Sequence, residues 1–390
     1  MTAGKSSESS LLPKSLVSAC RTRVERLQQA MGRQQVDALL ISAEKDIQYV
    51  TGFVGHESLA MVTANGAVII SDSRYDEYLQ PWRDAKPAGA SEIVMGIRHR
   101  LNDSVRDICQ RLKVKRLGVQ ADQVTVAGRA AVAAIVGSDR VADTAGLVSS
   151  LRMKKDALEV KAIEKAIAIA QQGLAAALER LEPGMSENQF SAVLEYEMKW
   201  RGASGAGFTP IIGSGANSSI IHHSTGHTVI REGVLLVDWG CVVDGYNSDL
   251  TRTFGIGQMP AKLKEAYRIV LDGQLAAIDA IKPGKTCAEI DAVARKVITD
   301  AGLGQYFGHG LGHGLGMDVH EGPYFNNLAT DVPVEPGLVM TVEPGVYIPG
   351  VGGVRVEDNV FVTETGCRVL SNYPKDPDST IITPHTVGAA

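Results

Sequence analysis

The sequence of 390 residues predicts an α/β domain followed by an α+β domain that is built from two copies of one unit. Three observations lead to this fold class. Helical and strand patterns alternate between Tyr75 and Val141, which is typical of an α/β domain. A long alanine-rich helical pattern begins near Ala157, and the chain after it carries the same helix-and-hairpin unit twice. We place the first domain at residues 14–150 and the second at residues 151–375.

The first elements follow from local patterns. The spacing of Val24, Leu27 and Met31 predicts a helix with one apolar stripe over residues 15–34. Strands are predicted at residues 38–42, 59–63 and 67–71. Residues 1–13 are rich in serine and are expected to be disordered, and no clear pattern follows Tyr373.

Composition restricts the class of partner and the compartment. The net charge is −5, from 39 basic and 44 acidic residues, and no long basic run is present, which argues against nucleic acid. Five scattered cysteines form no disulfide framework and no CxxC site, as expected in a reducing cytosol. No secretory segment follows the polar start, and the longest apolar run is far below the roughly 18 residues of a membrane span. We therefore expect a cytoplasmic protein with no membrane contact.

The stretch from Gly233 to Phe254 is predicted to form a hairpin that carries two acids. Asp238 ends a buried apolar run, where an unpaired carboxylate would cost several kcal/mol. If Asp244-Gly245 is the turn, Asp238 lies opposite Thr251, and Asp249 is two residues away on the same face. Such diagonal neighbours are roughly 7–8 Å apart, near enough to hold one metal cluster. The alternative is a hairpin with two solvated acids, but the run before Asp238 is too apolar for an exposed strand.

A second copy of this arrangement lies further along the chain. Two capping boxes, Ser186-x-x-Gln189 and Thr286-x-x-Glu289, each follow a Pro-Gly turn and each predict the start of a helix. The hairpin is matched by a strand that ends at Glu343 and by a following strand with Glu357. The duplication predicts two half-domains related by an approximate two-fold axis, with four acids converging at their junction.

Three histidines lie in a glycine-rich segment between the two hairpins, namely His309, His313 and His320. Repeated glycine permits close approach of backbone to a site, and three histidines in this setting favour function over structure. One histidine with four carboxylates is an oxygen-rich ligand set. It favours Mn²⁺ or Co²⁺ over a structural zinc site. Four clustered carboxylates carry about −4, which two divalent ions would neutralise.

These residues occur in five local contexts: D-x-G, S-D-x-T-R-T-F, G-H-G-x-G, E-P-G-x-Y and V-R-x-E-D. In these five contexts the chain resembles the pita-bread metallopeptidases. That family comprises prolidase, aminopeptidase P and methionine aminopeptidase, with creatinase as a metal-free relative. The resemblance implies two divalent ions, Mn²⁺ or Co²⁺ before Zn²⁺. It also implies that Asp249 and Glu357 bridge the metals, that Asp238 binds one ion, and that His313 and Glu343 bind the other.

The resemblance also covers the N-terminal half. Residues 46–53, DIQYVTGF, and residues 72–75, DSRY, look like the creatinase-type N-terminal domain, and residues 151–155 resemble the usual start of the catalytic domain. Methionine aminopeptidases lack such an N-terminal domain. One departure concerns the family's Pro-His, which is Ile221-His222 here, followed by His223 in a segment one residue shorter than usual. We assign the proton-handling role to His222, with His223 as the alternative.

The function that the resemblance implies is hydrolysis of the bond between an N-terminal residue and proline, by a hydroxide that two metal ions activate. Glu343 would accept the proton of the water, His222 and His320 would assist catalysis, and His309 and His320 would contact the substrate. Arg355 is expected to bind substrate and orient the site, or else to neutralise Glu357 or Asp358.

Several alternatives for the function remain open. Among peptides with proline in second position, an Xaa-Pro dipeptidase is favoured over an aminopeptidase P that acts on longer substrates. Methionine aminopeptidase and a non-catalytic binding protein of this fold are further alternatives, and relatives of this type suggest a homodimer.

Overall fold

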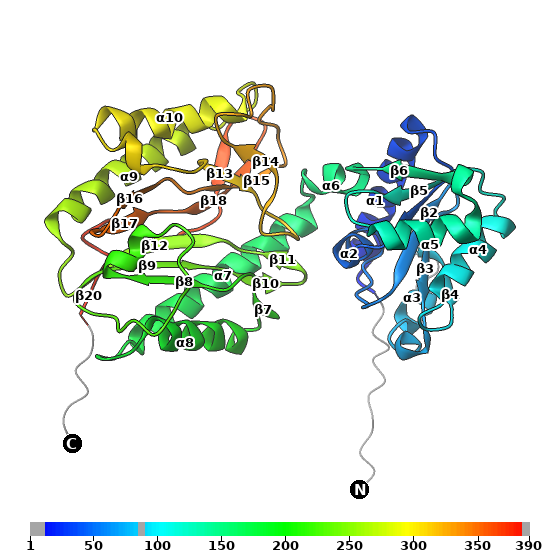
Figure 1. Ribbon diagram of the computed structural model, residues 1–390, viewed down its shortest axis with the longest axis horizontal. Helices are drawn as coiled ribbons and strands as arrows, with labels where there is room; N and C mark the ends of the chain where they lie inside the picture. The colour runs from blue at the N-terminus through cyan, green and yellow to red at the C-terminus, as the bar shows by residue number, and fades with distance from the viewer. Residues whose placement is uncertain (1–11, 85–89, 384–390) are drawn as a thin grey trace, which may run out of the picture. The chain divides into compact units, whose positions relative to one another are not determined.

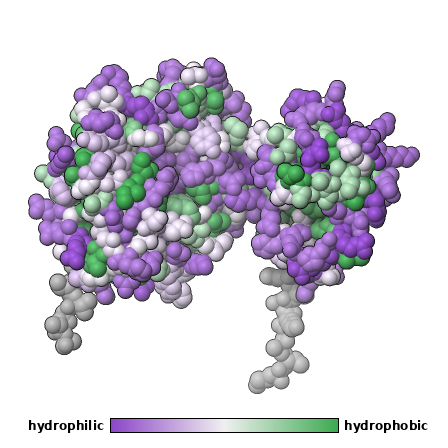
Figure 2. Space-filling model, in the orientation of Figure 1, coloured by the Kyte–Doolittle hydropathy of each residue, from purple (hydrophilic) through white to green (hydrophobic). Residues whose placement is uncertain are grey.

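The computed structural model describes residues 12–84 and 90–383, so most of the serine-rich segment that was predicted to be disordered lies outside the described residues. The chain divides into two compact units, Met1–Arg152 and Met153–Ala390 (Figure 1). Within the described ranges no helix is long and apolar enough to cross a membrane. Figure 2 shows that polar side chains dominate the visible face of each unit.

The N-terminal unit is built around one six-stranded sheet with the strand order β4-β3-β2-β1-β5-β6. Its elements are α1 (Lys14–Arg33), β1 (Ala38–Ile41), α2 (Glu44–Thr51), β2 (Leu59–Thr63), β3 (Gly66–Ser71), η1 (Ser73–Tyr75), α3 (Gln80–Asp84), β4 (Ala90–Met95), α4 (Leu101–Arg111), β5 (Leu117–Gln120), α5 (Val126–Val136), η2 (Ser138–Arg140), β6 (Val141–Thr144) and α6 (Leu147–Arg152).

Helices cover this sheet because its central strands are apolar on both sides. All four residues of β1 are buried, as expected for a strand between two layers of helices. Helices α1, α2 and α6 pack together, and α4 packs with α5. Strand β1 is parallel to β5 and antiparallel to β2, so the sheet is mixed. The predicted α/β class of this unit is confirmed.

Over residues 153–383 the C-terminal unit contains four α-helices, two short 3-10 helices and strands that form several small sheets. Its elements are α7 (Ala157–Glu179), α8 (Glu187–Trp200), β7 (Gly205–Ala206), β8 (Ile211–Ser214), η3 (Gly215–Ser219), β9 (Gly233–Trp239), β10 (Cys241–Val243), β11 (Tyr246–Asn247), β12 (Leu250–Ile256), α9 (Ala261–Ala280), α10 (Cys287–Asp300), η4 (Gly304–Tyr306), β13 (Gly312–Gly314), β14 (Glu321–Phe325), β15 (Val339–Val342), β16 (Gly345–Ile348), β17 (Gly352–Arg355), β18 (Asp358–Val362), β19 (Cys367–Val369) and β20 (Ile381–Ile382).

The duplication predicted from the sequence is visible in this unit. Each half supplies a long helix packed on a 14-residue helix, α7 with α8 and α9 with α10. Both 14-residue helices begin with a complete capping box, at Ser186 and Thr286. Each half also supplies three consecutive antiparallel strands, β8-β9-β12 and β13-β15-β18. In Figure 1 the strands lie between the two helix pairs.

The register of the first hairpin sets the direction of its acids. Thr251 of β12 pairs with Asp238 of β9, as the sequence predicted. The turn residues Asp244 and Gly245 have φ angles of 54° and 86°, the left-handed conformation that a two-residue turn of this kind requires. Trp239 is fully buried, and its indole N–H donates to the Ala170 carbonyl of α7 at 2.8 Å. Because side chains alternate along a strand, Asp238 projects to the opposite side.

The two halves meet where the second hairpin approaches the first. The backbone N–H of Glu357 donates to the carbonyl of Thr251 at 3.1 Å, and this bond joins the chain just before β18 to β12. Buried apolar side chains of α9 and α10 pack with those of the second-half strands, including Tyr267, Ile290 and Val342. The acids therefore lie at the junction of the halves, above a closely packed core.

Candidate metal centre

Four carboxylates converge at this junction. Asp238 belongs to β9, Asp249 precedes β12, Glu343 follows β15 and Glu357 precedes β18. Three of them, Asp238, Asp249 and Glu357, each offer an oxygen, and these oxygens lie within 4.8 Å of one another. A second group of the same size contains His313, Glu343 and Glu357. The structure thus brings together all five residues that were predicted as metal ligands.

His313 lies on β13 between two glycines that its position requires. A Cβ atom at Gly312 would lie 2.1 Å from the Thr341 carbonyl oxygen, and one at Gly314 would lie 2.4 Å from the Gly322 carbonyl oxygen. Only glycine permits such close approach of neighbouring strands. The imidazole Nδ1 lies 3.1 Å from the Gly314 carbonyl oxygen, a contact in which the ring nitrogen donates. This bond leaves Nε2 to face the carboxylates, as a histidine ligand does.

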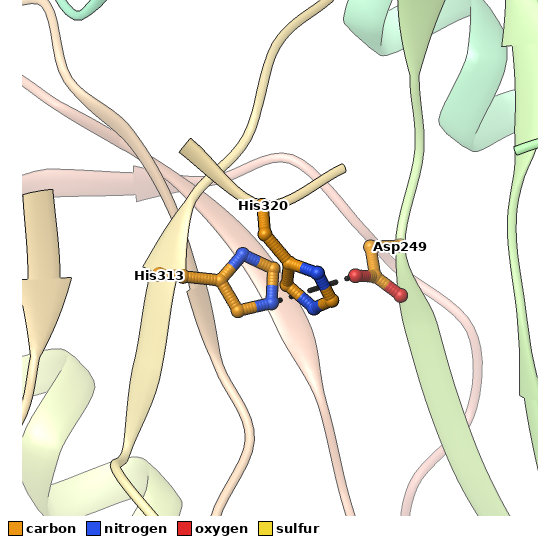
Figure 3. Close-up of side chains that lie close together, drawn as sticks. All are labelled: Asp249, His313 and His320. Atoms are coloured by element: carbon orange, nitrogen blue, oxygen red, sulfur yellow. Dashed lines mark ion pairs between the residues drawn. The ribbon is translucent and has the colours of Figure 1, made fainter. Parts of the chain in front are cut away.

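Figure 3 shows His313 and His320 side by side, with both rings directed toward Asp249. The His313 Nε2 lies 3.6 Å from an oxygen of Asp249 and 3.2 Å from an oxygen of Glu343. The two imidazole rings have centroids 4.3 Å apart and an interplanar angle of 74°. A third group of possible ligands consists of Asp249, His313 and His320. His320, predicted as a catalytic and substrate-binding residue, therefore adjoins the ligand cluster.

Crowding of acids in a buried place changes their ionisation. Burial and the neighbouring carboxylates raise the pKa of Asp249 and Glu357 well above the usual range. Burial also raises the pKa of Asp238, although Arg355 opposes the shift. For Glu343 the penalty of burial is outweighed by the hydrogen bond and charge of His313, which lower its pKa to about 2. Without a counter-charge beyond Arg355 and His313, the cluster therefore favours protonated forms of Asp249 and Glu357.

The donor set fits divalent cations. The Oδ1 atom of Asp238 and the Oε1 atom of Glu357 are buried and accept no hydrogen bond from any residue within 12–84 and 90–383. A buried carboxylate oxygen without a partner is costly unless a cation binds it. Both atoms belong to residues of the same group of three acids. Carboxylate oxygens with one imidazole nitrogen are ligands that manganese, cobalt and zinc accept.

Arg355 stabilises one acid of the cluster and is itself held from three sides. Its guanidinium donates to Asp238 Oδ2 at 2.5 Å, to the Tyr347 hydroxyl at 2.8 Å and to Thr251 Oγ1 at 3.0 Å. The Thr251 hydroxyl donates onward to Glu357 Oε2 at 2.7 Å. Asp238 is therefore the acid that Arg355 neutralises, in place of the Glu357 or Asp358 considered from the sequence. Asp358 instead pairs with Arg252 and Lys375.

His309 joins the same hydrogen-bond chain. Its Nε2 lies 3.0 Å from the Tyr347 hydroxyl and its Nδ1 lies 2.7 Å from the Gly310 carbonyl oxygen. Burial, with smaller effects of Arg355 and Arg295, lowers the pKa of His309, so the ring is neutral near pH 7. A neutral ring that donates from Nδ1 to Gly310 accepts at Nε2 from Tyr347. The chain of bonds thus runs from Arg355 through Tyr347 to His309.

A cavity of about 440 Å³ opens over the cluster. Glu357 is buried and does not line the cavity. The predicted residues that line it are Asp238, Asp249, His313, Glu343, His222, His309, His320 and Arg355. His222 is exposed at this wall, whereas the neighbouring His223 faces Glu187 with an Nε2–Oε2 distance of 2.8 Å. His222 thus lines the cavity and His223 does not, and the proton-handling role of His222 stays a prediction.

Some lining residues were not predicted. The apolar and polar side chains that complete the walls are Phe208, Thr209, Ile211, Ile221, Val319, Tyr324 and Asn326. Their contribution depends on tertiary packing, and no local pattern marks them. Tyr347 and Thr251 were also missed as parts of the Arg355 network, although both lie inside the contexts E-P-G-x-Y and S-D-x-T-R-T-F. Their position inside these two contexts was the signal available in the sequence.

Comparison with known proteins places the chain in a family. Residues 161–364 match Metallopeptidase family M24, and residues 23–154 match the Creatinase/Prolidase N-terminal domain. The chain belongs to metallopeptidase family M24. The resemblance inferred from the five motifs is thereby confirmed, as is the pita-bread fold of the C-terminal unit.

Named members of family M24 resemble the chain over nearly its whole length. An Xaa-Pro dipeptidase of Pyrococcus horikoshii is 32% identical over 357 residues, which cover 91% of this chain and 98% of the relative. The solved Xaa-Pro dipeptidase from Bacillus anthracis is 36% identical with a TM-score of 0.86, covering 93% of this chain and 100% of that one. The X-Pro aminopeptidase from Thermotoga maritima is 31% identical with a TM-score of 0.83, covering 91% and 99%.

Proposed function

We propose that this M24 metallopeptidase is an Xaa-Pro dipeptidase, which hydrolyses the bond between an N-terminal residue and proline. The observation that carries the proposal is the convergence of four carboxylates and His313 at the floor of a cavity. Relatives named Xaa-Pro dipeptidase, in sequence and in structure, support the substrate class. The cavity volume of about 440 Å³ is within the usual range for sites that take small molecules.

The five side chains Asp238, Asp249, His313, Glu343 and Glu357 would hold two divalent ions. Asp249 and Glu357 each occur in two of the three overlapping ligand groups, whereas Asp238 and Glu343 occur in one, which supports bridging roles for the former pair. The oxygen-rich set favours Mn²⁺ or Co²⁺. When bound, such ions would supply Lewis-acid activation of water and of the scissile carbonyl.

Glu343 is the proposed proton acceptor. Its low pKa keeps it a carboxylate, and Thr341 donates to its Oε1 at 3.3 Å and so helps to orient it. A carboxylate at the cavity wall can take a proton from the attacking water and transfer it to the nitrogen of the leaving proline. That transfer is needed because the nitrogen of an Xaa-Pro bond carries no hydrogen of its own.

His222 and His320 are proposed to stabilise the charge that develops on the carbonyl oxygen. Both line the cavity, and burial together with the charge of His313 lowers the pKa of His320. A neutral imidazole near pH 7 can donate one N–H group to an oxyanion. The apolar side chains Phe208, Ile211 and Ile221 on the same walls provide a surface for the pyrrolidine ring.

His309 and Arg355 complete the proposed substrate-binding set. His309 lines the cavity and is the terminal member of the chain that begins at Arg355, so we propose that it contacts the substrate. Arg355 is 3% exposed and donates to Asp238, which makes orientation of Asp238 its main proposed task. Rigid orientation of a ligand by its neighbours is a common requirement of metal sites.

An Xaa-Pro aminopeptidase that acts on longer peptides is the second candidate. Arg355 is the one lysine or arginine among the cavity-lining residues that the structure describes, and its guanidinium already donates to Asp238. A dipeptidase must also bind the free carboxylate of its product. The likeness to an X-Pro aminopeptidase, with a TM-score of 0.83, agrees with this alternative.

The proposal is tested by metal analysis together with hydrolysis of Ala-Pro. The purified chain is treated with a chelator, reloaded with Mn²⁺ or Co²⁺, and assayed on Ala-Pro, on Ala-Ala and on a peptide that begins with methionine. We expect about two ions per chain and metal-dependent hydrolysis of Ala-Pro alone. Cleavage after methionine would favour methionine aminopeptidase, and full metal loading without turnover would favour a binding protein of this fold.

The compartment and assembly state are also proposed. Cys109, Cys241, Cys287 and Cys367 are free thiols, which supports a reducing compartment such as the cytoplasm. The family resemblance supports a homodimer. Light scattering of the purified chain tests the assembly state directly, with a monomer mass as the contradicting result.

A further inference from the structure

Glu187 makes a buried set of hydrogen bonds that the proposed reaction does not use. It is the first residue of α8, and its side chain is fully buried. Its Oε1 accepts from the Ser214 backbone N–H at 2.8 Å and from Asn217 Nδ2 at 2.9 Å. Its Oε2 lies 2.8 Å from His223 Nε2 and accepts from the Gly226 N–H at 3.3 Å. Ser214 ends β8, and the other three partners belong to the connection between β8 and β9.

The carboxylate is suited to this task because it is ionised. Burial raises the pKa of Glu187, but hydrogen bonds from His223, Asn217 and the Ser214 backbone outweigh burial, and the net shift is downward. A charged acceptor makes hydrogen bonds stronger than a neutral one. An apolar substitute would leave several buried donors without a partner, and each of these would destabilise the loop conformation.

The same connection forms part of the cavity wall. Ile221 and His222 line the cavity, and the charge of His222 is one of the influences that lower the pKa of His320. On its other side the connection is fixed to β17, where the Gly353 N–H donates to Ser218 Oγ at 2.8 Å. Segment 215–228 therefore extends from the buried Glu187 carboxylate to the groups proposed to act on substrate.

The second half of the unit offers an internal comparison. Cys287 occupies the matching first position of α10, directly after the capping residue Thr286. The backbone contacts are alike, because Glu187 N–H donates to the Thr228 carbonyl and Cys287 N–H donates to the Val332 carbonyl. In the second half, a later segment of the chain thus packs on the start of α10 without a carboxylate at the first helical position. The carboxylate is present in the half whose segment carries His222.

We propose that Glu187 is a positioning residue, which holds segment 215–228 so that His222 faces the substrate. The inference rests on the proposed function, since it assumes that His222 acts during hydrolysis. Glu187 does not line the cavity and acts through the loop. The effect of losing it should therefore fall on turnover, while the metal cluster, formed by other elements, keeps its ions.

The test compares Glu187→Gln with Ser186→Ala in the metal-loaded full chain. Glu187→Gln keeps the size of the side chain but turns one acceptor into a donor that opposes the Gly226 N–H. We expect kcat on Ala-Pro to fall by about ten- to a hundredfold, the cost of a small misplacement in an active site, with little change in metal content. Ser186→Ala removes the cap of the same helix, so it should lower the unfolding midpoint and leave kcat unchanged.

Two further measurements distinguish an effect of Glu187 through segment 215–228 from a general loss of stability. Hydrogen–deuterium exchange of segment 215–228 should be faster in Glu187→Gln and unchanged in Ser186→Ala. In a His222→Ala background, Glu187→Gln should cost little more, because both changes remove the same contribution. Unchanged exchange in Glu187→Gln, or full additivity of the two losses, would overturn the inference. Wild-type turnover of His222→Ala would instead remove His222 from the proposed function, and the exchange measurement would still decide whether Glu187 holds the loop.

Discussion

The guanidinium of Arg355 donates to Asp238 Oδ2 at 2.5 Å, so one member of the candidate metal cluster has a buried counter-charge of its own. The other oxygen of that carboxylate, Oδ1, is buried and accepts no hydrogen bond from the part of the chain that the structure describes. Asp238 thus directs one oxygen to a protein cation, and its other oxygen is the one that we propose as a metal ligand.

Arg355→Lys should weaken the site although it keeps the positive charge. Lysine has no planar fork with which to reach Asp238, Tyr347 and Thr251 at once. We expect kcat/KM on Ala-Pro to fall by about 10–100-fold, as is usual when the support of a metal ligand is lost. Tyr347→Phe is the matched control, which breaks the link to His309 and leaves Asp238 paired. An Arg355→Lys enzyme with wild-type kcat/KM would show that orientation of Asp238 is unimportant.

Asp249→Asn should remove metal and activity together. Asp249 contributes to two ligand groups, so its loss affects both proposed ion positions. Elemental analysis after dialysis is expected to find fewer than two ions per chain, with hydrolysis of Ala-Pro lost. Two tightly held ions in Asp249→Asn would contradict the bridging assignment.

The metal-free protein should lose stability as pH rises above the ordinary range of a carboxylic acid. The pKa of Asp249 and Glu357 is raised in the folded chain, so these groups bind more protons folded than unfolded. Stability from such groups is present below about pH 4, the unfolded pKa, and declines as pH rises toward the folded pKa.

Thermal unfolding in chelator, from about pH 5 to pH 8, measures this decline against Asp249→Asn, which lacks one of the acids. The midpoint difference between the variant and wild type should grow in favour of the variant as pH rises. Addition of Mn²⁺ should reverse the order, because the ions stabilise only the intact cluster. A difference that does not depend on pH would contradict the raised pKa.

Glu343→Gln should separate proton transfer from binding. Glutamine has a similar size and can still offer an oxygen, but it cannot accept the proton of the attacking water. We expect kcat to fall by about 10²–10⁴-fold with a smaller change in KM. Metal content should stay closer to wild type than in Asp249→Asn. A kcat within a fewfold of wild type would exclude Glu343 as the base.

Much of the site could be predicted because its ligands occur in local patterns. The apolar strand before Asp238, the Asp244-Gly245 turn and the duplicated capping boxes each follow from short-range rules, and the register of Asp238 with Thr251 resulted from them. Glycines around His313 indicated close backbone approach, which the structure shows as contacts that a Cβ atom could not occupy.

What could not be predicted depends on contacts far apart in sequence. Arg355 has Asp238 as its partner across 117 positions, and no local rule selects that acid over Glu357 or Asp358. In the sequence Glu187 looks like an ordinary acidic residue in the first turn of a helix, and only the structure shows its four hydrogen-bond partners. Strand β20 was missed because Ile381–Ile382 is too short to show a pattern and forms only by parallel pairing with β12.

The most direct test of the central claim is kcat/KM of the Mn²⁺-loaded enzyme on Ala-Pro, compared with Ala-Pro-Ala, a longer Xaa-Pro peptide and Ala-Ala. An Xaa-Pro dipeptidase is predicted to hydrolyse Ala-Pro with the highest kcat/KM and to leave Ala-Ala almost untouched. The chelated enzyme and Asp249→Asn should be inactive on all four. A clear preference for Ala-Pro-Ala or the longer peptide would contradict the dipeptidase assignment, and equal hydrolysis of Ala-Ala would contradict proline specificity itself.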